Sequence, residues 1–213
     1  MNIWWRQVCL HPLLRGLLFV VPLIARPSEV DQMLRTAGLA GMLCVMCSVA
    51  AADPQTPDSA SGRMLDRMRG LVGAWEGTLE WSGARTGSGK LRATYHLTGG
   101  GSALVEDLLM GEGDTPSMTT VYHLDGADLR MTHFCAAQNQ PRLKATRIDD
   151  ATGTATFTFV DVTNASSHPS YVDGFSIHII DPDHLNIKFE FGGASPKRAT
   201  ENIVLQRVKP AAS

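Results

Sequence analysis

Apolar and polar residues alternate in ten short segments that together occupy most of the chain after residue 73. Alternation with a period of two sends successive side chains to opposite faces, which is typical of a strand with one buried face. Clusters of Gly, Asp, Asn and Pro separate the segments, as in sheets whose strands are joined by tight turns. The predicted strands cover residues 74–82, 90–98, 102–110, 117–124, 128–136, 142–148, 154–162, 171–180, 184–191 and 201–208.

The connections between these segments predict how the strands are arranged. None of them is long enough to hold the crossover helix that parallel neighbours require. One short helix precedes the strands, because charged residues separate apolar ones that recur at helical spacing, namely Met64, Leu65, Met68, Leu71 and Val72. We therefore predict an all-β fold, an antiparallel up-and-down barrel of ten strands with one short N-terminal helix.

The same alternation predicts which side chains face the barrel interior. One face of the first strand carries Trp75, Gly77, Leu79 and Trp81, and one face of the ninth carries Leu185, Ile187, Phe189 and Phe191. If residues 125–128 form a four-residue turn, the inward pairs across it are Leu124 with Leu129, Tyr122 with Met131, Thr120 with His133, and Met118 with Cys135. His123 and His178 are then expected on the outer face.

Several polar residues are predicted to lie among the apolar ones inside the barrel. They are Tyr95, Glu106, Thr120, Tyr122, His133 and Cys135, with Arg142 at the rim. Two interpretations stand side by side. The set lines a pocket for a small molecule, or its members satisfy one another, His133 with Thr120 and Glu106 with Tyr95 or an arginine.

Reactive chemistry is a weaker interpretation of the same residues. A metal site built from His133, Cys135 and Glu106 would lack a fourth ligand and the paired spacings of structural zinc, so no metal site is predicted. A thiol among apolar residues has a raised pKa and is a poor nucleophile. Glu106 could act as a general base only if burial raised its pKa towards neutrality beside a substrate-sized cavity.

The turn after the fifth strand has two interpretations of its own. As structure, Asn139 bonds its own backbone and Pro141 holds the preceding residue extended, which fixes a tight connection. As function, the amides of residues 138–140 hydrogen bond a polar ligand at the barrel mouth. We favour the structural interpretation. The long polar connection at 164–170 is a candidate lid.

The N-terminal region predicts the location of the protein. Residues 33–52 have the order of a secretory signal, with a basic start at Arg35, an uncharged stretch from Thr36 to Ala52, and small residues before Asp53. The uncharged stretch is shorter than the roughly 20 apolar residues that cross a membrane. We predict cleavage near Ala52 and a periplasmic or secreted mature protein without a stable membrane anchor.

The remaining segments divide around that signal. Residues 1–32 are interpreted as an over-extended leader before a start at Met33, residues 53–61 as a linker, and residues 62–210 as one barrel domain. After residue 52 the chain has 15 lysines and arginines against 19 aspartates and glutamates, a net charge of −4. Without a basic cluster, nucleic acid is not an expected partner. Cys135 is the only cysteine after the leader, so no intramolecular disulfide is expected.

The stretch Leu71-Val72-Gly73-Ala74-Trp75-Glu76-Gly77 resembles the Gly-x-Trp opening of lipocalin-like (calycin) barrels. In that family the tryptophan of the first strand packs near the closed end under an arginine from the last strand. The resemblance implies structural roles for Gly73, Trp75 and Arg207, with a cation-π contact of about 1 kcal/mol between the last two.

Three further motifs are similar to those of a group of exported bacterial lipocalin-like proteins of unknown function. They are Gly100-Gly101-Ser102-Ala103-Leu104-Val105-Glu106, Tyr122-His123-Leu124-Asp125-Gly126, and Thr132-His133-Phe134-Cys135 followed by Asn139-Gln140-Pro141. A more distant similarity is to the haem-binding nitrobindin barrels, which also open with Gly-x-Trp-x-Gly. No residue here matches their haem-ligating histidine.

The sequence thus predicts an exported calycin-like barrel that binds a small apolar or amphipathic molecule and needs no cofactor. Tyr95, Glu106, Tyr122 and His133 are the expected polar contacts. The alternatives are a hydrolase or isomerase that uses Glu106 and His133, a haem-binding or metal-binding barrel, and a stress-related envelope protein with a solid core whose surface binds another protein.

Overall fold

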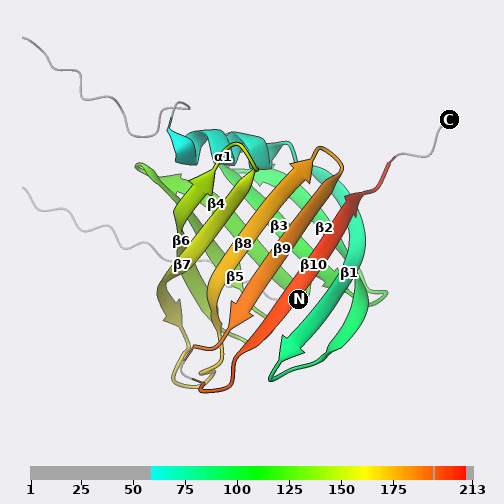
Figure 1. The fold of residues 1–213 in the computed structure, drawn as a ribbon, viewed down its shortest axis with the longest axis vertical. Coiled ribbons are helices and arrows are strands. Elements are labelled where there is room, and N and C mark those ends of the chain that lie inside the picture. Colours follow the sequence, from blue (N-terminus) through cyan, green and yellow to red (C-terminus); the bar gives the residue numbers. More distant parts are fainter. Residues whose placement is uncertain (1–58, 194, 210–213) are drawn as a thin grey trace, which may run out of the picture. The chain divides into compact units, whose positions relative to one another are not determined.

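A computed structural model describes residues 59–193 and 195–209 (Figure 1). The predicted leader, signal peptide and cleavage site, with most of the predicted linker, lie outside these residues. Ten antiparallel strands form a closed barrel in which each strand pairs with its neighbours in sequence and β1 pairs with β10. This confirms the predicted up-and-down topology.

The strands lie close to their predicted positions. Their bounds are β1 Gly73–Gly83, β2 Gly87–Thr98, β3 Ala103–Met110, β4 Met118–Asp125, β5 Asp128–Phe134, β6 Gln140–Asp149, β7 Thr154–Thr163, β8 Val172–Asp181, β9 His184–Phe191 and β10 Ala199–Arg207, with a 3-10 turn η1 at Gly99–Gly101. Buried and exposed residues alternate along most of them, because inward side chains fill the core and outward ones meet solvent.

The register between β4 and β5 follows the predicted hairpin. Leu124 pairs with Leu129, Tyr122 with Met131, and Thr120 with His133. The predicted pair of Met118 with Cys135 does not form, because β5 ends at Phe134. Cys135 instead begins the next turn, where its backbone N–H donates to the Asn139 carbonyl at 3.1 Å.

Helix α1, Ala60–Arg69, lies across one end of the barrel (Figure 1). Its N-cap is Ser59, whose hydroxyl accepts from the Gly62 N–H at 2.9 Å. The predicted apolar residues Met64, Leu65, Met68 and Leu71 are buried in the barrel core, whereas Val72 is 43% exposed. The helix begins two residues before the predicted domain boundary at residue 62. Of the described residues, none belongs to a helix of the length and apolarity needed to span a membrane.

The contact between Trp75 and Arg207 forms as predicted. The Arg207 guanidinium carbon lies 4.4 Å from the Trp75 ring centroid, and the guanidinium donates to the carbonyls of Gly70, Val72 and Pro182 at 2.7–2.9 Å. The indole N–H of Trp75 donates to the Leu71 carbonyl at 2.7 Å. These bonds connect the segment between α1 and β1 to β10 and to the turn between β8 and β9, and so close this end of the barrel.

Glycine is required at residue 77 by the close approach of β10. A Cβ atom there would lie 1.8 Å from the Val204 carbonyl oxygen, well inside van der Waals contact. The two strands can therefore come this near to each other only if residue 77 has no side chain.

Candidate functional site in the barrel interior

Four of the predicted site residues form one row across four neighbouring strands. Tyr95 on β2 pairs with Glu106 on β3, Glu106 with Thr120 on β4, and Thr120 with His133 on β5. All four side chains are buried. We call this set the polar row. The alternation of each strand, together with the β4–β5 register, was sufficient to predict that these residues face the interior.

Hydrogen bonds satisfy only part of the polar row. Thr120 Oγ1 and His133 Nδ1 are hydrogen bonded at 2.9 Å, and the Tyr122 hydroxyl donates to Glu106 Oε2 at 2.7 Å. Among the described residues, Tyr95 Oη, Glu106 Oε1 and His133 Nε2 lack a hydrogen-bond partner of good geometry, although the Tyr95 hydroxyl is near enough to the Glu106 carboxylate to lower its pKa. The interpretation that these residues satisfy one another therefore explains the two hydrogen bonds but not the atoms without partners. Each buried polar group without a partner costs about 1 to 3 kcal/mol.

Burial sets the charge state of these groups. It raises the pKa of Glu106 to about 7, and the Tyr122 and Tyr95 hydroxyls only partly oppose that rise. Burial also lowers the pKa of His133 to about 4, so the imidazole is neutral at pH 7. For both Tyr95 and Tyr122, burial and then the charge of Glu106 raise the pKa well above 10. The polar row therefore carries at most one titrating charge near neutral pH.

An aromatic surface faces the polar row from the other side of the barrel. Phe157 on β7 pairs with Phe175 on β8, and Phe175 with Phe189 on β9; we call these three residues the aromatic row. The His133 and Phe189 ring centroids are 4.9 Å apart, and those of Tyr122 and Phe175 are 6.0 Å apart. The two rows thus meet inside the barrel, and their side chains fill its middle.

The aromatic row continues into an acidic residue that the sequence analysis missed. Phe189 pairs with Glu201 on β10, and Glu201 pairs with Trp81 on β1. Glu201 is 0% exposed, and neither of its carboxylate oxygens has a hydrogen-bond partner within the described part of the chain. Burial raises its pKa to about 7, and the charge of Arg85 opposes the rise. The sequence pattern that would have predicted this burial is that Glu201 shares its strand face with the apolar residues Ile203 and Leu205.

Arg142, predicted at the rim, lies near the start of β6 with its side chain on the outer surface. Its side chain is half exposed and its Nε donates to Asp161 Oδ1 on β7. The register between β6 and β7 shifts between Arg142 and Leu143, and the buried neighbours of Arg142 are Pro141 and Leu143. The side chain is therefore directed away from the polar row.

Asn139 connects two loops rather than bonding its own backbone. Its side-chain N–H₂ group donates to the carbonyls of His168 and Ser170 at 2.9 and 2.8 Å. The residue is buried, although Asn139 lies in a turn. The predicted structural role is retained with a different partner, because Asn139 holds the candidate lid at 164–170 against the end of the barrel.

Cys135 is a free, partly buried thiol at the same end. Burial raises its pKa, and the charge of Glu201 raises it further. A neutral thiol is a poor nucleophile. Within residues 59–193 and 195–209, no three His, Cys, Asp or Glu side chains are grouped closely enough to hold a metal ion.

The two ends of the barrel differ in how well they are closed. Leu104 and Leu205, towards α1, are 0% exposed, whereas Trp81 and Phe191, at the end away from α1, are 8% and 9% exposed. The latter end therefore brings aromatic surface nearest to solvent, and we call it the distal end.

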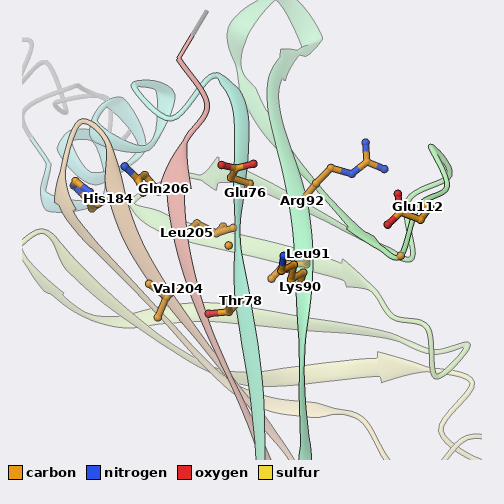
Figure 2. A pocket seen from close by; sticks show the side chains of 12 residues that line it. Glu76, Thr78, Lys90, Leu91, Arg92, Glu112, His184, Val204, Leu205 and Gln206 are labelled. Atoms are coloured by element: carbon orange, nitrogen blue, oxygen red, sulfur yellow. The ribbon is translucent and has the colours of Figure 1, made fainter. Parts of the chain in front are cut away.

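A separate groove of about 570 Å³ lies along β10, β1 and β2 (Figure 2). Most of its lining side chains project outward, including Thr78, Lys90 and Val204. No member of the polar row lines it. The groove is thus a feature of the outer wall, distinct from the candidate site in the interior.

Comparison with known proteins yields only distant structural likenesses. No family model matches the sequence, and no curated protein matches it either. A protein of unknown function from the DUF3598 family of Nostoc punctiforme is 12% identical, with a TM-score of 0.47 over 66% of this chain and 48% of that one. Rv2717c from M. tuberculosis is 13% identical, with a TM-score of 0.45 over 68% of this chain and 98% of that one. This chain therefore spans about half the length of the first.

Proposed function

We propose that the protein binds a small amphipathic molecule inside its barrel, between the polar row and the aromatic row. The observation that carries the proposal is the set of buried atoms without partners, Tyr95 Oη, Glu106 Oε1 and His133 Nε2, opposite aromatic rings. A mostly apolar enclosure with a few convergent polar groups is how small-molecule sites are usually built.

A bound polar group would remove a cost that the barrel carries without a ligand. Each buried atom without a partner destabilises the protein by about 1 to 3 kcal/mol, and a ligand that hydrogen bonds it recovers part of that energy. The apolar part of the same ligand would contact the rings of Phe157, Phe175 and Phe189. This division of the interior favours an amphipathic molecule over a purely apolar one.

Binding requires the two rows to separate, because their side chains already touch. The distal end is the expected entrance, since the buried rings of Trp81 and Phe191 lie nearest to solvent there while α1 covers the other end. Association that waits for side-chain rearrangement is slower than association with an open pocket.

The test is a titration with Nile red, a neutral dye whose emission shifts to the blue in apolar surroundings. Two substitutions separate the interior from the outer groove: Tyr95→Phe removes a buried hydroxyl without a partner from the polar row, and Thr78→Val removes an exposed hydroxyl from the groove. We expect Tyr95→Phe to weaken binding about fivefold, because the dye loses one hydrogen bond worth about 1 kcal/mol. No blue shift with the wild type, or sensitivity to Thr78→Val alone, contradicts the proposal.

An acid-base enzyme is the second candidate, and one observation favours it. The pKa of Glu106 near 7 is suited to a general acid or base at neutral pH. Glu106→Gln would then abolish turnover of an ester such as p-nitrophenyl butyrate while leaving its affinity unchanged. A binding protein shows no turnover above the buffer rate with either form.

We also propose that the protein acts outside the cytoplasm, from the signal-like order of residues 33–52. Mass spectrometry of the native protein tests this directly. An N-terminus near Asp53 supports export, and retention of Trp4 and Trp5 contradicts it.

A further inference from the structure

Glu201 lies among aromatic rings at the distal end. It pairs with Trp81 on one side and Phe189 on the other, and the Trp81 and Phe191 ring centroids are 5.0 Å apart. Phe191 in turn lies 6.3 Å from Phe189, again between centroids. The carboxyl group is thus bordered by three aromatic side chains.

This combination of groups is unfavourable unless a positive charge is added. An ionised carboxylate inside a protein needs a partner, and neither oxygen of Glu201 has one among the described residues. The faces of aromatic rings carry negative partial charge, so they do not stabilise a carboxylate but do attract cations. A carboxylate beside aromatic faces is therefore complementary to an organic cation.

The structure already holds one cation on this aromatic surface. The Arg85 guanidinium carbon lies 3.9 Å from the Trp81 ring centroid. Arg85 is exposed and belongs to the turn between β1 and β2, so its side chain can move without disturbing a strand. It does not hydrogen bond Glu201, whose oxygens both lack partners. A ligand cation could reach this carboxylate once Arg85 moves aside.

Other chemistry fits the distal end less well. Burial raises the pKa of the Cys135 thiol and the charge of Glu201 raises it further, so the thiol is neutral. His133 is neutral as well, because burial lowers its pKa to about 4. A divalent metal ion would need further ligands, and the described residues contain no suitable group of three. A single organic charge is what one carboxylate and its rings can balance.

We infer that the ligand carries an organic ammonium group, in addition to the polar group that the polar row binds, and that the Glu201 carboxylate and the rings of Trp81 and Phe191 bind this ammonium at the distal end. The apolar remainder of the ligand then lies along the aromatic row. This inference rests on the proposed interior binding and adds the chemical class of the ligand. Arg85 occupies part of the cation site when no ligand is bound.

The test compares three probes of equal length by isothermal titration calorimetry at pH 8: octylammonium, 1-octanol and octanoate. At this pH Glu201, with a pKa near 7, is mostly ionised. We expect octylammonium to bind at least tenfold more tightly than octanol, and octanoate to bind more weakly than either. Glu201→Gln should bring octylammonium to the affinity of octanol while leaving octanol binding unchanged.

A matched control removes the same charge from the outer wall. Glu80 precedes Trp81 on β1 and is exposed, so Glu80→Gln should leave the preference for octylammonium intact. Equal losses in the two variants would show a general charge effect and overturn the inference. An unchanged preference in Glu201→Gln would overturn it too. Glu201→Gln removes a buried charge without changing side-chain volume, so we expect this variant to fold, as circular dichroism can verify.

Two outcomes with the wild type separate the inference from the proposed function. If octanol and octylammonium bind equally well, the barrel binds amphiphiles but the ammonium assignment is wrong. If none of the three probes binds, the proposed interior binding is wrong as well.

Arg85→Ala supplies an independent readout. Removing the resident cation frees the Trp81 ring and removes a positive charge beside the site, so we expect octylammonium to bind about three- to tenfold more tightly. A merely structural role for Arg85 predicts no gain. Weaker octylammonium binding in Arg85→Ala would contradict the assigned site.

Discussion

The two ends of the barrel carry the same pair of side chains in different settings. At the α1 end Arg207 lies over Trp75 of β1, and at the distal end Arg85 lies over Trp81 of the same strand. Arg207 is also held by three backbone carbonyls, whereas Arg85 makes no hydrogen bond within the part of the chain that the structure describes. The arginine over a tryptophan therefore stabilises the fold at the α1 end, whereas at the distal end it is a cation that a ligand can displace.

The surroundings of each pair explain the difference. The α1 end is covered by a helix whose apolar residues join the barrel core. The distal end has the rings of Trp81 and Phe191, which are 8% and 9% exposed, and a buried carboxyl group without hydrogen-bond partners among the described residues. Stability and binding are thus concentrated at opposite ends. The following predictions test that separation, beginning with the largest expected effect.

Replacing the two arginines should affect stability very unequally. Arg207→Ala removes three hydrogen bonds and a cation-π contact, so we expect a loss of about 4 kcal/mol in the free energy of unfolding. Arg85→Ala should cost about 1 kcal/mol or less, because it loses the ring contact and a charge interaction with Glu201 but no hydrogen bond to a described residue. Urea denaturation of both variants measures the contrast. Similar losses would show that the two ends are equivalent.

Glu201→Gln should change how stability depends on pH. The pKa of Glu201 is about 7 in the folded protein and lies near its ordinary value of 4.5 in the unfolded chain, so the folded state binds the proton more tightly. This contribution to stability is fully present below about pH 4.5 and is lost as the pH rises to about 7. Glutamine does not titrate. Glu201→Gln should therefore gain about 3 kcal/mol relative to wild type between pH 5 and pH 8.

The control for that experiment is again Glu80→Gln, which removes an exposed carboxylate from β1 and leaves Glu201 in place. Glu106 also has a pKa near 7, so Glu106→Gln should behave as Glu201→Gln does. A Glu201→Gln profile parallel to that of the wild type would mean that Glu201 is not buried as described.

Asn139→Ala should loosen the distal end alone. The substitution removes two hydrogen bonds to the carbonyls of His168 and Ser170, with an expected cost of about 2 kcal/mol. Hydrogen exchange read by mass spectrometry should speed up in residues 164–170 and stay unchanged in α1. Faster exchange at both ends would indicate global rather than local opening.

Ser59→Ala is the corresponding change at the α1 end and should have the smallest effect. Loss of the N-cap bond to the Gly62 N–H is expected to cost about 1 kcal/mol and to speed exchange at the start of the helix. Nile red binding should not change, because α1 lies away from the distal end. Weaker dye binding would place the entrance at the α1 end and contradict an entrance at the distal end.

Much of the fold was predictable because strand alternation and turn residues are local signals. The Asp125-Gly126 turn set the parity of β4 and β5, and that parity placed Thr120 and His133 on the interior face. The same alternation within β6 places Arg142 on the outer face, opposite to the buried Pro141 and Leu143. Its ion pair with Asp161 depends on the register between β6 and β7, which shifts between Arg142 and Leu143 and which alternation within one strand cannot show.

The distal site was less predictable for a different reason. Glu201 is the first residue of the predicted strand 201–208, although β10 begins at Ala199. Charged residues at strand ends usually face solvent, so the face that Glu201 shares with Ile203 and Leu205 was not used in the prediction. The contact of Arg85 with Trp81 spans a turn and depends on rotamers that the residue pattern does not encode. Asn139 was identified as structural, but its partners lie about 30 residues away and become neighbours only when the barrel closes.

Intermolecular nuclear Overhauser effects between octylammonium and the protein test the central claim most directly. If the ligand lies inside the distal end, its methylene protons should give contacts to the ring protons of Phe189 and Phe191. Contacts confined to Thr78 and Val204 would place the probe in the outer groove and would contradict binding inside the barrel.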